Sequence, residues 1–162
     1  LLLCGQAFAQ DAYDATNGFA ASGYDVVAYW SLERVAPNAA PPAPVPGRES
    51  LTVEHLGTVY AFSSEENRAA FVEDPERYLP EYGGHCAFGV SRGVKPAGNP
   101  TLWRIDDGRL YFNGTEVVYD LFREDIPGNL SLADANWPAL ELEPAALNVL
   151  QDFDPLSAPL SD

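Results

Sequence analysis

The sulfur of Cys86 and the imidazole rings of His85 and His55 are the side chains of this sequence best suited to chemistry. Cys86 follows a Tyr-Gly-Gly-His stretch at residues 82–85. A thiolate is a soft metal ligand, and a neutral imidazole binds copper or zinc well. Because three ligands of mixed nitrogen and sulfur type suffice for such an ion, we predict a copper or zinc site formed by Cys86, His85 and His55.

Two other roles for Cys86 stay open. The paired glycines before it can bend the backbone and present the thiol at a pocket, which favours a thiol-redox protein with Cys86 as the candidate catalytic residue. Free cysteine is also among the most buried residue types, so the chain can instead be a non-catalytic binding scaffold with Cys86 in its core. The sequence contains no serine-hydrolase motif and no phosphate-binding loop, which favours a protein that is not an enzyme.

The charge of the chain excludes two classes of partner. The 162 residues include 24 acidic and 9 basic side chains, for a formal net charge of −15. Such a surface repels phosphate backbones and anionic lipids, so we expect no nucleic-acid partner. No stretch approaches the roughly 20 apolar residues of a membrane helix, so we expect no membrane span. A metal ion or a small molecule is the expected partner, and the protein is expected to be a monomer or a dimer.

The start of the sequence is typical of an exported protein. An apolar stretch ending in Ala7-Phe8-Ala9 predicts a residual signal peptide over residues 1–9, cleaved after Ala9. The protein is then periplasmic or secreted. Cleavage removes Cys4 and leaves Cys86 as the single cysteine in an oxidising compartment.

Composition divides the rest of the chain into three parts. Residues 10–23 are small and polar and predict an N-terminal arm. Residues 24–138 form the predicted domain, with a proline-rich loop at 36–47 that cannot be a central strand. Residues 139–162 are acidic and predict a mostly disordered tail.

The elements that must position the candidate site are two hairpins and several short helices. Alternating apolar residues predict one hairpin that turns near Gly57 and a second that turns at Asp107-Gly108. Residues 24–30 suit a strand or an extended segment, and residues 88–100 suit a short helix or a loop. The fold class is therefore α+β, a single domain with a small antiparallel sheet of two β-hairpins packed with three or four short helices.

Three helices are predicted from their boundary signals. Ser63 and Glu66 suit a capping box at the start of a helix over 64–73. A second helix is predicted over 116–123, with Val117, Leu121 and Phe122 facing inward. A third is predicted over 130–137, ended by Pro138.

The ordered set of motifs resembles the YHS-domain proteins, and in particular an exported bacterial subfamily of them. The resemblance covers about residues 18–138. It rests on the strings at 23–29, 60–67, 71, 74–75, 78–79, 82–87, 98–100, 103, 107–113, 126–129 and 133–138. The subfamily has no settled activity, so the resemblance implies an exported YHS-domain protein without naming its function.

Related YHS and TRASH-type domains bind metal through cysteines, and this chain departs from them there. The resemblance places those cysteines at positions that here hold Ala28, Ser63 and Asn67. None of these side chains is a good soft-metal ligand, so the family site is expected to be lost. The subfamily includes selenoproteins, and the resemblance places their selenocysteine at the position of Cys86, which implies chemistry at that sulfur.

Overall fold

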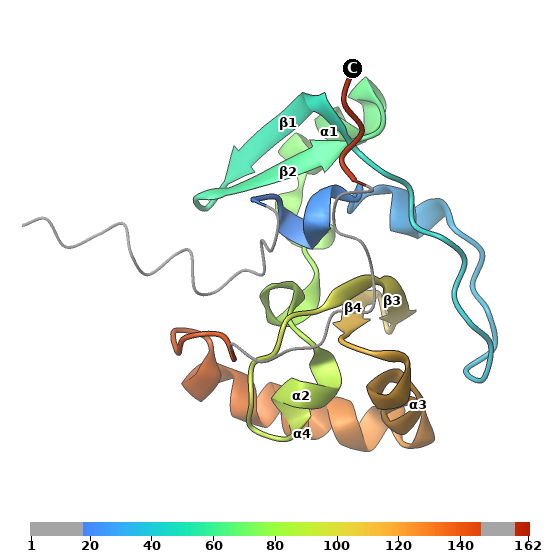
Figure 1. The fold of residues 1–162 in the computed structure, drawn as a ribbon, viewed down its shortest axis with the longest axis vertical. Coiled ribbons are helices and arrows are strands. Elements are labelled where there is room, and N and C mark those ends of the chain that lie inside the picture. The colour runs from blue at the N-terminus through green and yellow to red at the C-terminus, as the bar shows by residue number, and fades with distance from the viewer. Residues whose placement is uncertain (1–17, 147–157) are drawn as a thin grey trace, which may run out of the picture.

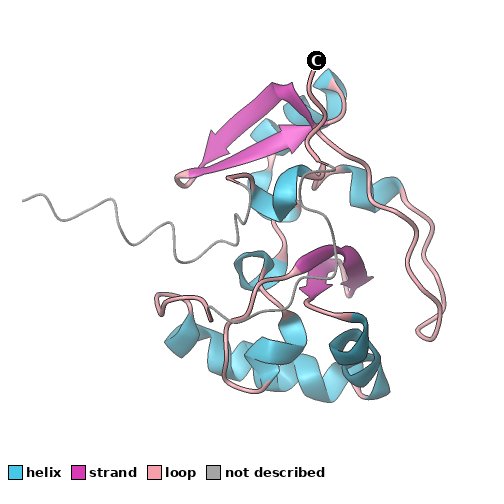
Figure 2. Ribbon diagram, viewed as in Figure 1, coloured by secondary structure: helices cyan, strands magenta, loops and turns pink. Residues whose placement is uncertain are grey.

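The computed structural model describes residues 18–146 and 158–162, and within them the chain folds as a single α+β domain (Figures 1 and 2). Two antiparallel hairpins form two separate two-stranded sheets. Their strands are β1 (Arg48–His55), β2 (Thr58–Phe62), β3 (Asn99–Asp106) and β4 (Arg109–Asn113). The α-helices are α1 (Glu65–Glu73), α2 (Ala87–Ser91), α3 (Glu116–Glu124) and α4 (Ile126–Leu140). The predicted fold class is confirmed.

Both hairpins turn where the sequence predicts. Leu56 and Gly57 have φ of 51° and 80°, and Asp107 and Gly108 have φ of 46° and 71°. Positive φ at both central residues is the requirement of the two-residue turn that matches the twist of paired strands. Each hairpin therefore has its register set by local turn chemistry.

Helix α1 begins one residue later than the predicted capping box implies. Ser64, not Ser63, is the N-cap residue, and its side chain accepts a hydrogen bond from the backbone N–H of Asn67 at 3.1 Å. Ser63 instead donates its hydroxyl to a buried carboxylate of Asp25. The capping box of Ser63 and Glu66 is therefore wrong, although the helix itself is confirmed.

Helix α3 is confirmed, and so is the inward position of Phe122, but Val117 and Leu121 do not face inward. Phe122 is fully buried, while Val117 is 70% exposed and Leu121 is 40% exposed. Tyr119 takes the remaining inward position and is 4% exposed. The segment has two rows of apolar side chains at helical spacing, Val117 with Leu121 and Tyr119 with Phe122. The row that contains Tyr119, whose side chain ends in a hydroxyl group, faces the core.

Helix α4 is longer than predicted at both ends. It begins at the N-cap Asp125, whose side chain accepts a hydrogen bond from the Gly128 N–H at 3.0 Å. Pro127 lies in the first turn, where a missing N–H costs nothing. Pro138 lies inside the last turn, and the Glu141 N–H still bonds to the Trp137 carbonyl at 2.9 Å. Pro138 therefore does not end the helix.

The N-terminal segment of the domain contains short 3-10 helices in place of the expected strand or extended segment. One spans Ala20–Gly23 and the next spans Ala28–Ser31. Val26 and Tyr29 are fully buried, in the same hydrophobic cluster as Tyr60 and Phe62 of β2. The proline-rich loop then leads to β1 along one side of the molecule (Figure 1).

Two hydrophobic clusters meet at β4. Leu110 and Phe112 belong to a cluster with Tyr29, Phe62 and Phe71 on the side of β1, β2 and α1. Tyr111 belongs to the other cluster, whose members include Tyr82, Val90, Phe122 and Ala133 from η4 (Glu81–Gly84), α2, α3 and α4. Successive side chains of a strand point to opposite faces, so β4 contributes to both clusters. Figure 1 shows the β3–β4 hairpin between the other two groups of elements.

The end of the chain packs beside the first strand. The Leu160 N–H donates to the Gly47 carbonyl at 2.8 Å, and the Glu49 N–H donates to the Leu160 carbonyl at 3.0 Å. Residues 158–162 thus differ from the predicted disordered tail, and the tail residues 147–157 lie outside the described residues. The predicted signal peptide over residues 1–9 lies outside them as well. No helix in the described part of the chain is long and apolar enough to cross a membrane.

Candidate functional site

Cys86 is the N-cap residue of α2, and its sulfur is enclosed. The side chain is 1% exposed, and Sγ accepts a hydrogen bond from the Gly89 N–H at 3.4 Å. The thiol also donates to Oδ1 of Asn113 at 3.8 Å. Burial raises the pKa of the Cys86 thiol, and the nearby N–H groups of Gly89, Gly114 and Phe88 only partly oppose that rise. The neutral thiol is therefore the favoured form.

The glycine turn before Cys86 brings backbones close together and does not open the thiol to solvent. Tyr82, Gly83 and Gly84 have φ of 54°, 62° and 82°, a left-handed run that glycine adopts readily. Across the turn, a Cβ on Gly98 would lie 2.0 Å from the Gly84 carbonyl oxygen. A Cβ on Gly114 would lie 3.7 Å from the Cys86 sulfur. The glycines thus allow the chain to close around Cys86.

His85 is also buried, at 2% exposed. Its Nδ1 lies 2.9 Å from the Tyr82 carbonyl oxygen, within the same turn. Its ring lies 6.1 Å, centroid to centroid, from the ring of Trp137 on α4. These contacts make His85 part of the packing between the glycine turn and α4.

His55 lies at the end of β1, in the other half of the core. Its ring is 5.7 Å from that of Phe71 and 6.4 Å from that of Tyr60, in edge-on contacts. Its Nε2 is 3.9 Å from Oε1 of Glu76, an exposed residue. His55 therefore belongs to the hydrophobic contact between the first hairpin and α1.

The predicted ligand set of Cys86, His85 and His55 is not assembled. Across residues 18–146 and 158–162, no three His, Cys, Asp or Glu side chains gather as a metal-binding group. Cys86 and His85 are sequence neighbours in the glycine turn, whereas the contacts of His55 are with β2, α1 and the residues after it. The spacing in sequence could not reveal this separation, because each histidine is held by a different hairpin or turn.

The most extensively hydrogen-bonded side chain of the described chain, Asp25, was not predicted as a site residue. It is fully buried. Oδ1 accepts from the N–H groups of Val27 and Ala28 at 2.9 and 3.1 Å. Oδ2 accepts from the Ser63 N–H at 2.8 Å, from the Ser63 hydroxyl at 2.6 Å and from the Asn67 amide at 2.8 Å. Five donors therefore satisfy one buried carboxylate.

The three positions that the resemblance assigns to lost cysteine ligands do converge in space. Ala28, Ser63 and Asn67 all donate to the Asp25 carboxylate. Among the described residues, every hydrogen-bond donor that reaches Asp25 is a neutral N–H or O–H group. This arrangement joins the N-terminal 3-10 segment to the start of α1 through hydrogen bonds.

A second polar cluster lies at the outer end of the glycine turn. The Arg109 guanidinium donates to both carboxylate oxygens of Asp134, at 2.9 and 3.1 Å, and to Glu81 at 2.7 Å. The Tyr82 hydroxyl donates to Asp134 at 2.8 Å. The hydrogen bond from Arg109 lowers the pKa of Asp134, while burial raises the pKa of Tyr82. The cluster fixes the left-handed Tyr82 against α4, and no local sequence signal marks it.

Comparison with known proteins finds no family model that matches the chain, no matching curated protein and no matching solved structure.

Proposed function

We propose that this protein is a non-catalytic binding module of the YHS type in which Cys86 serves the fold. The observation that carries the proposal is the enclosure of the sulfur as the N-cap acceptor of α2. A helix that begins in the core needs acceptors for its first N–H groups, and Cys86 supplies one for Gly89. The resemblance to YHS-domain proteins, carried by the ordered motifs of residues 18–138, supports the family part of the proposal.

The thiol-redox alternative needs conditions that these contacts oppose. A reactive cysteine is partly exposed and has a lowered pKa, usually beside a cation. Cys86 is 1% exposed, and burial raises its pKa. Among the described residues, no Lys or Arg is a hydrogen-bond partner of its sulfur. These three facts support the structural role of Cys86 over a redox role.

Alkylation with iodoacetamide tests the proposal directly. In a Cys4→Ser chain, Cys86 is the only thiol, so mass spectrometry at pH 7.5 reports its modification alone. We expect almost no modification in the folded protein and complete modification in guanidinium chloride. Fast modification of the folded protein, as seen with a low-pKa thiol, would overturn the proposal in favour of redox chemistry.

A metal titration is the second test of the proposed function. We expect that Zn²⁺ and Cu²⁺ added to the folded protein bind no differently to the wild-type chain and to Cys86→Ala. The control is His55→Ala, which removes the separate histidine of the first hairpin. Stoichiometric uptake that is lost in Cys86→Ala would overturn the binding-module proposal and support a metal site at this sulfur.

A further inference from the structure

Residues 158–162 lie along the edge of β1 that faces away from β2, as a short added strand (Figure 1). The Leu160 N–H donates to the Gly47 carbonyl at 2.8 Å, and the Glu49 N–H donates to the Leu160 carbonyl at 3.0 Å. Arg48, between these two residues of β1, pairs with Leu160 on one side and with β2 on the other. Such a pair of main-chain hydrogen bonds is the way in which a sheet edge binds an extended peptide.

The added strand also contacts the protein through its side chains. Ala158 is 2% exposed and belongs to the hydrophobic cluster on the side of β1, β2 and α1. Pro159 packs against Gly23, where a Cβ would lie 2.3 Å from the proline Cδ. At the end of the segment, the Ser50 hydroxyl donates to the Asp162 carboxylate at 2.8 Å. The site therefore favours a small residue followed by proline, with a polar end.

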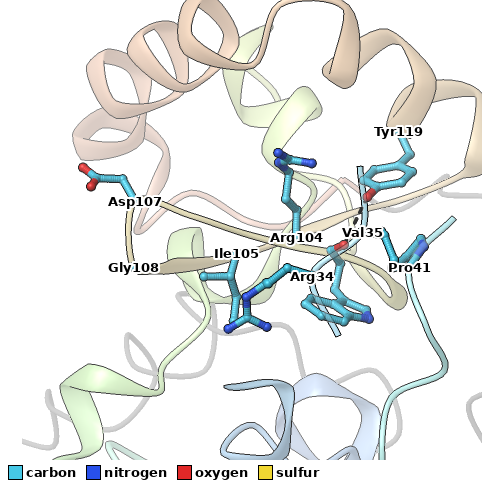
Figure 3. Close-up of a pocket in the computed structure, with 9 residues that line it drawn as sticks. Arg34, Val35, Pro41, Arg104, Ile105, Asp107, Gly108 and Tyr119 are labelled. Atoms are coloured by element: carbon cyan, nitrogen blue, oxygen red, sulfur yellow. Dashed lines mark hydrogen bonds between the residues drawn. The ribbon is translucent and has the colours of Figure 1, made fainter. Parts of the chain in front are cut away.

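The second hairpin repeats the arrangement of the first, so the two strand edges can be compared position by position. The elements β3, β4 and α3 begin 51 residues after β1, β2 and α1, and the register of each hairpin shifts at the equivalent place. Arg68 of α1 donates to the Thr52 carbonyl of β1 at 3.2 Å. At the equivalent positions, Tyr119 of α3 donates to the Trp103 carbonyl of β3 at 3.1 Å, and Figure 3 shows Tyr119 reaching from α3 toward β3. Each hairpin and the helix after it therefore form one copy of a repeated unit.

The two equivalent edges differ at one backbone group. Pro100 of β3 stands at the position of Glu49 in β1, 51 residues later. Proline has no N–H, so the β3 edge cannot donate the hydrogen bond that Glu49 gives to Leu160. Proline on an edge strand prevents the addition of a further strand. Strand addition is therefore possible at the first unit and blocked at the second.

We propose that the β1 edge is a docking site for an extended segment with the sequence Ala-Pro-Leu, and that its partner is a second copy of this chain. In a single chain the site holds residues 158–162 of the same molecule. In a pair of chains, each copy supplies this segment to the other. The proposal goes beyond the proposed function and is independent of the role of Cys86, because the β1 edge and residues 82–87 share no residue.

Two observations favour a second copy as the partner. The segment that fits the edge is part of the chain itself, so every copy brings both the segment and the edge. Residues 147–157 connect the segment to Ala146, whose N–H is bonded to the Lys95 carbonyl at 2.9 Å. A connection between two anchored points lets the last strand be exchanged between copies, which is a low-cost route to a dimer. Within one chain the connection keeps the segment at an effective concentration of about 1 mM, so exchange needs a high protein concentration or an impaired segment.

Binding of a fluorescein-labelled peptide with the sequence of residues 157–162, followed by fluorescence anisotropy, tests the site. Ala158→Asp places a charge in the core and Leu160→Pro removes the N–H that bonds to Gly47, so both variants of the full chain leave the edge free. We expect each variant to bind the peptide at least about tenfold more tightly than the wild-type chain, whose edge is already filled. Leu160→Ser is the matched control and should behave as the wild type, since the Leu160 side chain is 43% exposed and its N–H is retained. A peptide with aspartate in place of alanine should not bind.

Mixing two variants tests the partner. Gly23→Ala puts a Cβ where Pro159 lies, so this chain has a free segment and a blocked edge. The Ala158→Asp chain has a free edge and a defective segment. In sedimentation velocity experiments we expect each variant alone to be a monomer, and the mixture to contain a 1:1 heterodimer.

Three results would overturn the proposal: no saturable peptide binding to a folded variant with a free edge, equal peptide binding by these variants and the wild-type chain, or no heterodimer in the mixture. Circular dichroism spectra identify the variants that remain folded. Leu160→Pro leaves the core side chains unchanged, so it takes the place of Ala158→Asp in both measurements if that variant does not fold.

Discussion

The side-chain amide of Asn67 donates a 2.8 Å hydrogen bond to the carboxylate of Asp25, 42 residues earlier in the chain. The same carboxylate oxygen accepts two hydrogen bonds from Ser63. One buried acceptor thus holds the start of α1 against the N-terminal 3-10 segment. The geometry fixes where the first helix lies relative to the segment that precedes the proline-rich loop.

Asp25→Asn should therefore destabilise the fold strongly. An asparagine presents an NH₂ group to donors that all need an acceptor, so buried N–H groups lose their partner. We expect a loss of about 3 kcal/mol in the free energy of unfolding, measured by urea denaturation. The control Glu66→Gln changes an exposed carboxylate of α1 and should alter stability by less than about 0.5 kcal/mol. Equal effects of the two substitutions would contradict the role given to Asp25.

The inward face of α3 can be tested by truncating one side chain from each apolar stripe. Phe122→Ala removes a fully buried ring and should cost about 3–5 kcal/mol. Val117→Ala removes methyl groups from a side chain that is 70% exposed and should change stability little. Urea denaturation of both variants measures the difference. A larger loss in Val117→Ala would restore the inward position predicted for Val117.

The ion pair of Arg109 and Asp134 makes a pH-dependent contribution to stability. The hydrogen bond from Arg109 lowers the pKa of Asp134 in the folded protein. The carboxylate therefore stabilises the fold above its unfolded pKa of about 4, and the contribution is lost as the pH falls through the folded pKa. Because Asp134 is half exposed, Asp134→Asn should cost only about 0.5 kcal/mol at pH 7.

Urea denaturation between pH 7 and pH 3 measures this effect. The difference between wild type and Asp134→Asn should shrink below about pH 4, as the wild-type carboxyl becomes protonated. Asp74→Asn is the control, since Asp74 is exposed and forms no ion pair among the described residues. A difference that stays constant over the whole range would show that charge is not the cause.

The close approach of backbones behind Cys86 predicts an unusually sensitive glycine. In Gly98→Ala the new Cβ would meet the Gly84 carbonyl, so the turn that encloses Cys86 must move. We expect a loss above about 3 kcal/mol and faster alkylation of Cys86 by iodoacetamide. Gly108→Ala is the matched control, because its Cβ has open space and only its positive φ is strained, at a cost of about 1 kcal/mol. Similar losses in the two variants would argue against tight packing at Gly98.

The features that the sequence predicts well are those set by neighbouring residues. Both hairpin turns need positive φ at two adjacent positions, and Asp107-Gly108 is a strong signal for that geometry. The helix over 64–73 follows from serine and glutamate residues at its start and Asp74-Pro75 at its end. Such signals act within a few residues, so they remain valid whatever the tertiary structure.

The features that the sequence does not predict depend on distant partners. Nothing in the sequence distinguishes Asp25 from the other acidic residues, because only the fold brings Ser63 and Asn67 to its carboxylate. The inward face of α3 is ambiguous in the sequence. Val117 and Leu121 have a spacing that places them on one face of a helix, and so do Tyr119 and Phe122. The separation of His55 from Cys86 follows from the placement of two hairpins, which no spacing along the chain encodes.

The sharing of β4 by the two hydrophobic clusters has a consequence for synthesis of the protein. A ribosome releases the first hairpin and α1 well before Leu110 and Phe112, the residues that complete their cluster. Until β4 has left the exit tunnel, the cluster on the side of β1, β2 and α1 lacks these two side chains. Once β4 pairs with β3, both clusters can close on its two faces, so we expect the domain to fold as one unit, without a stable N-terminal half.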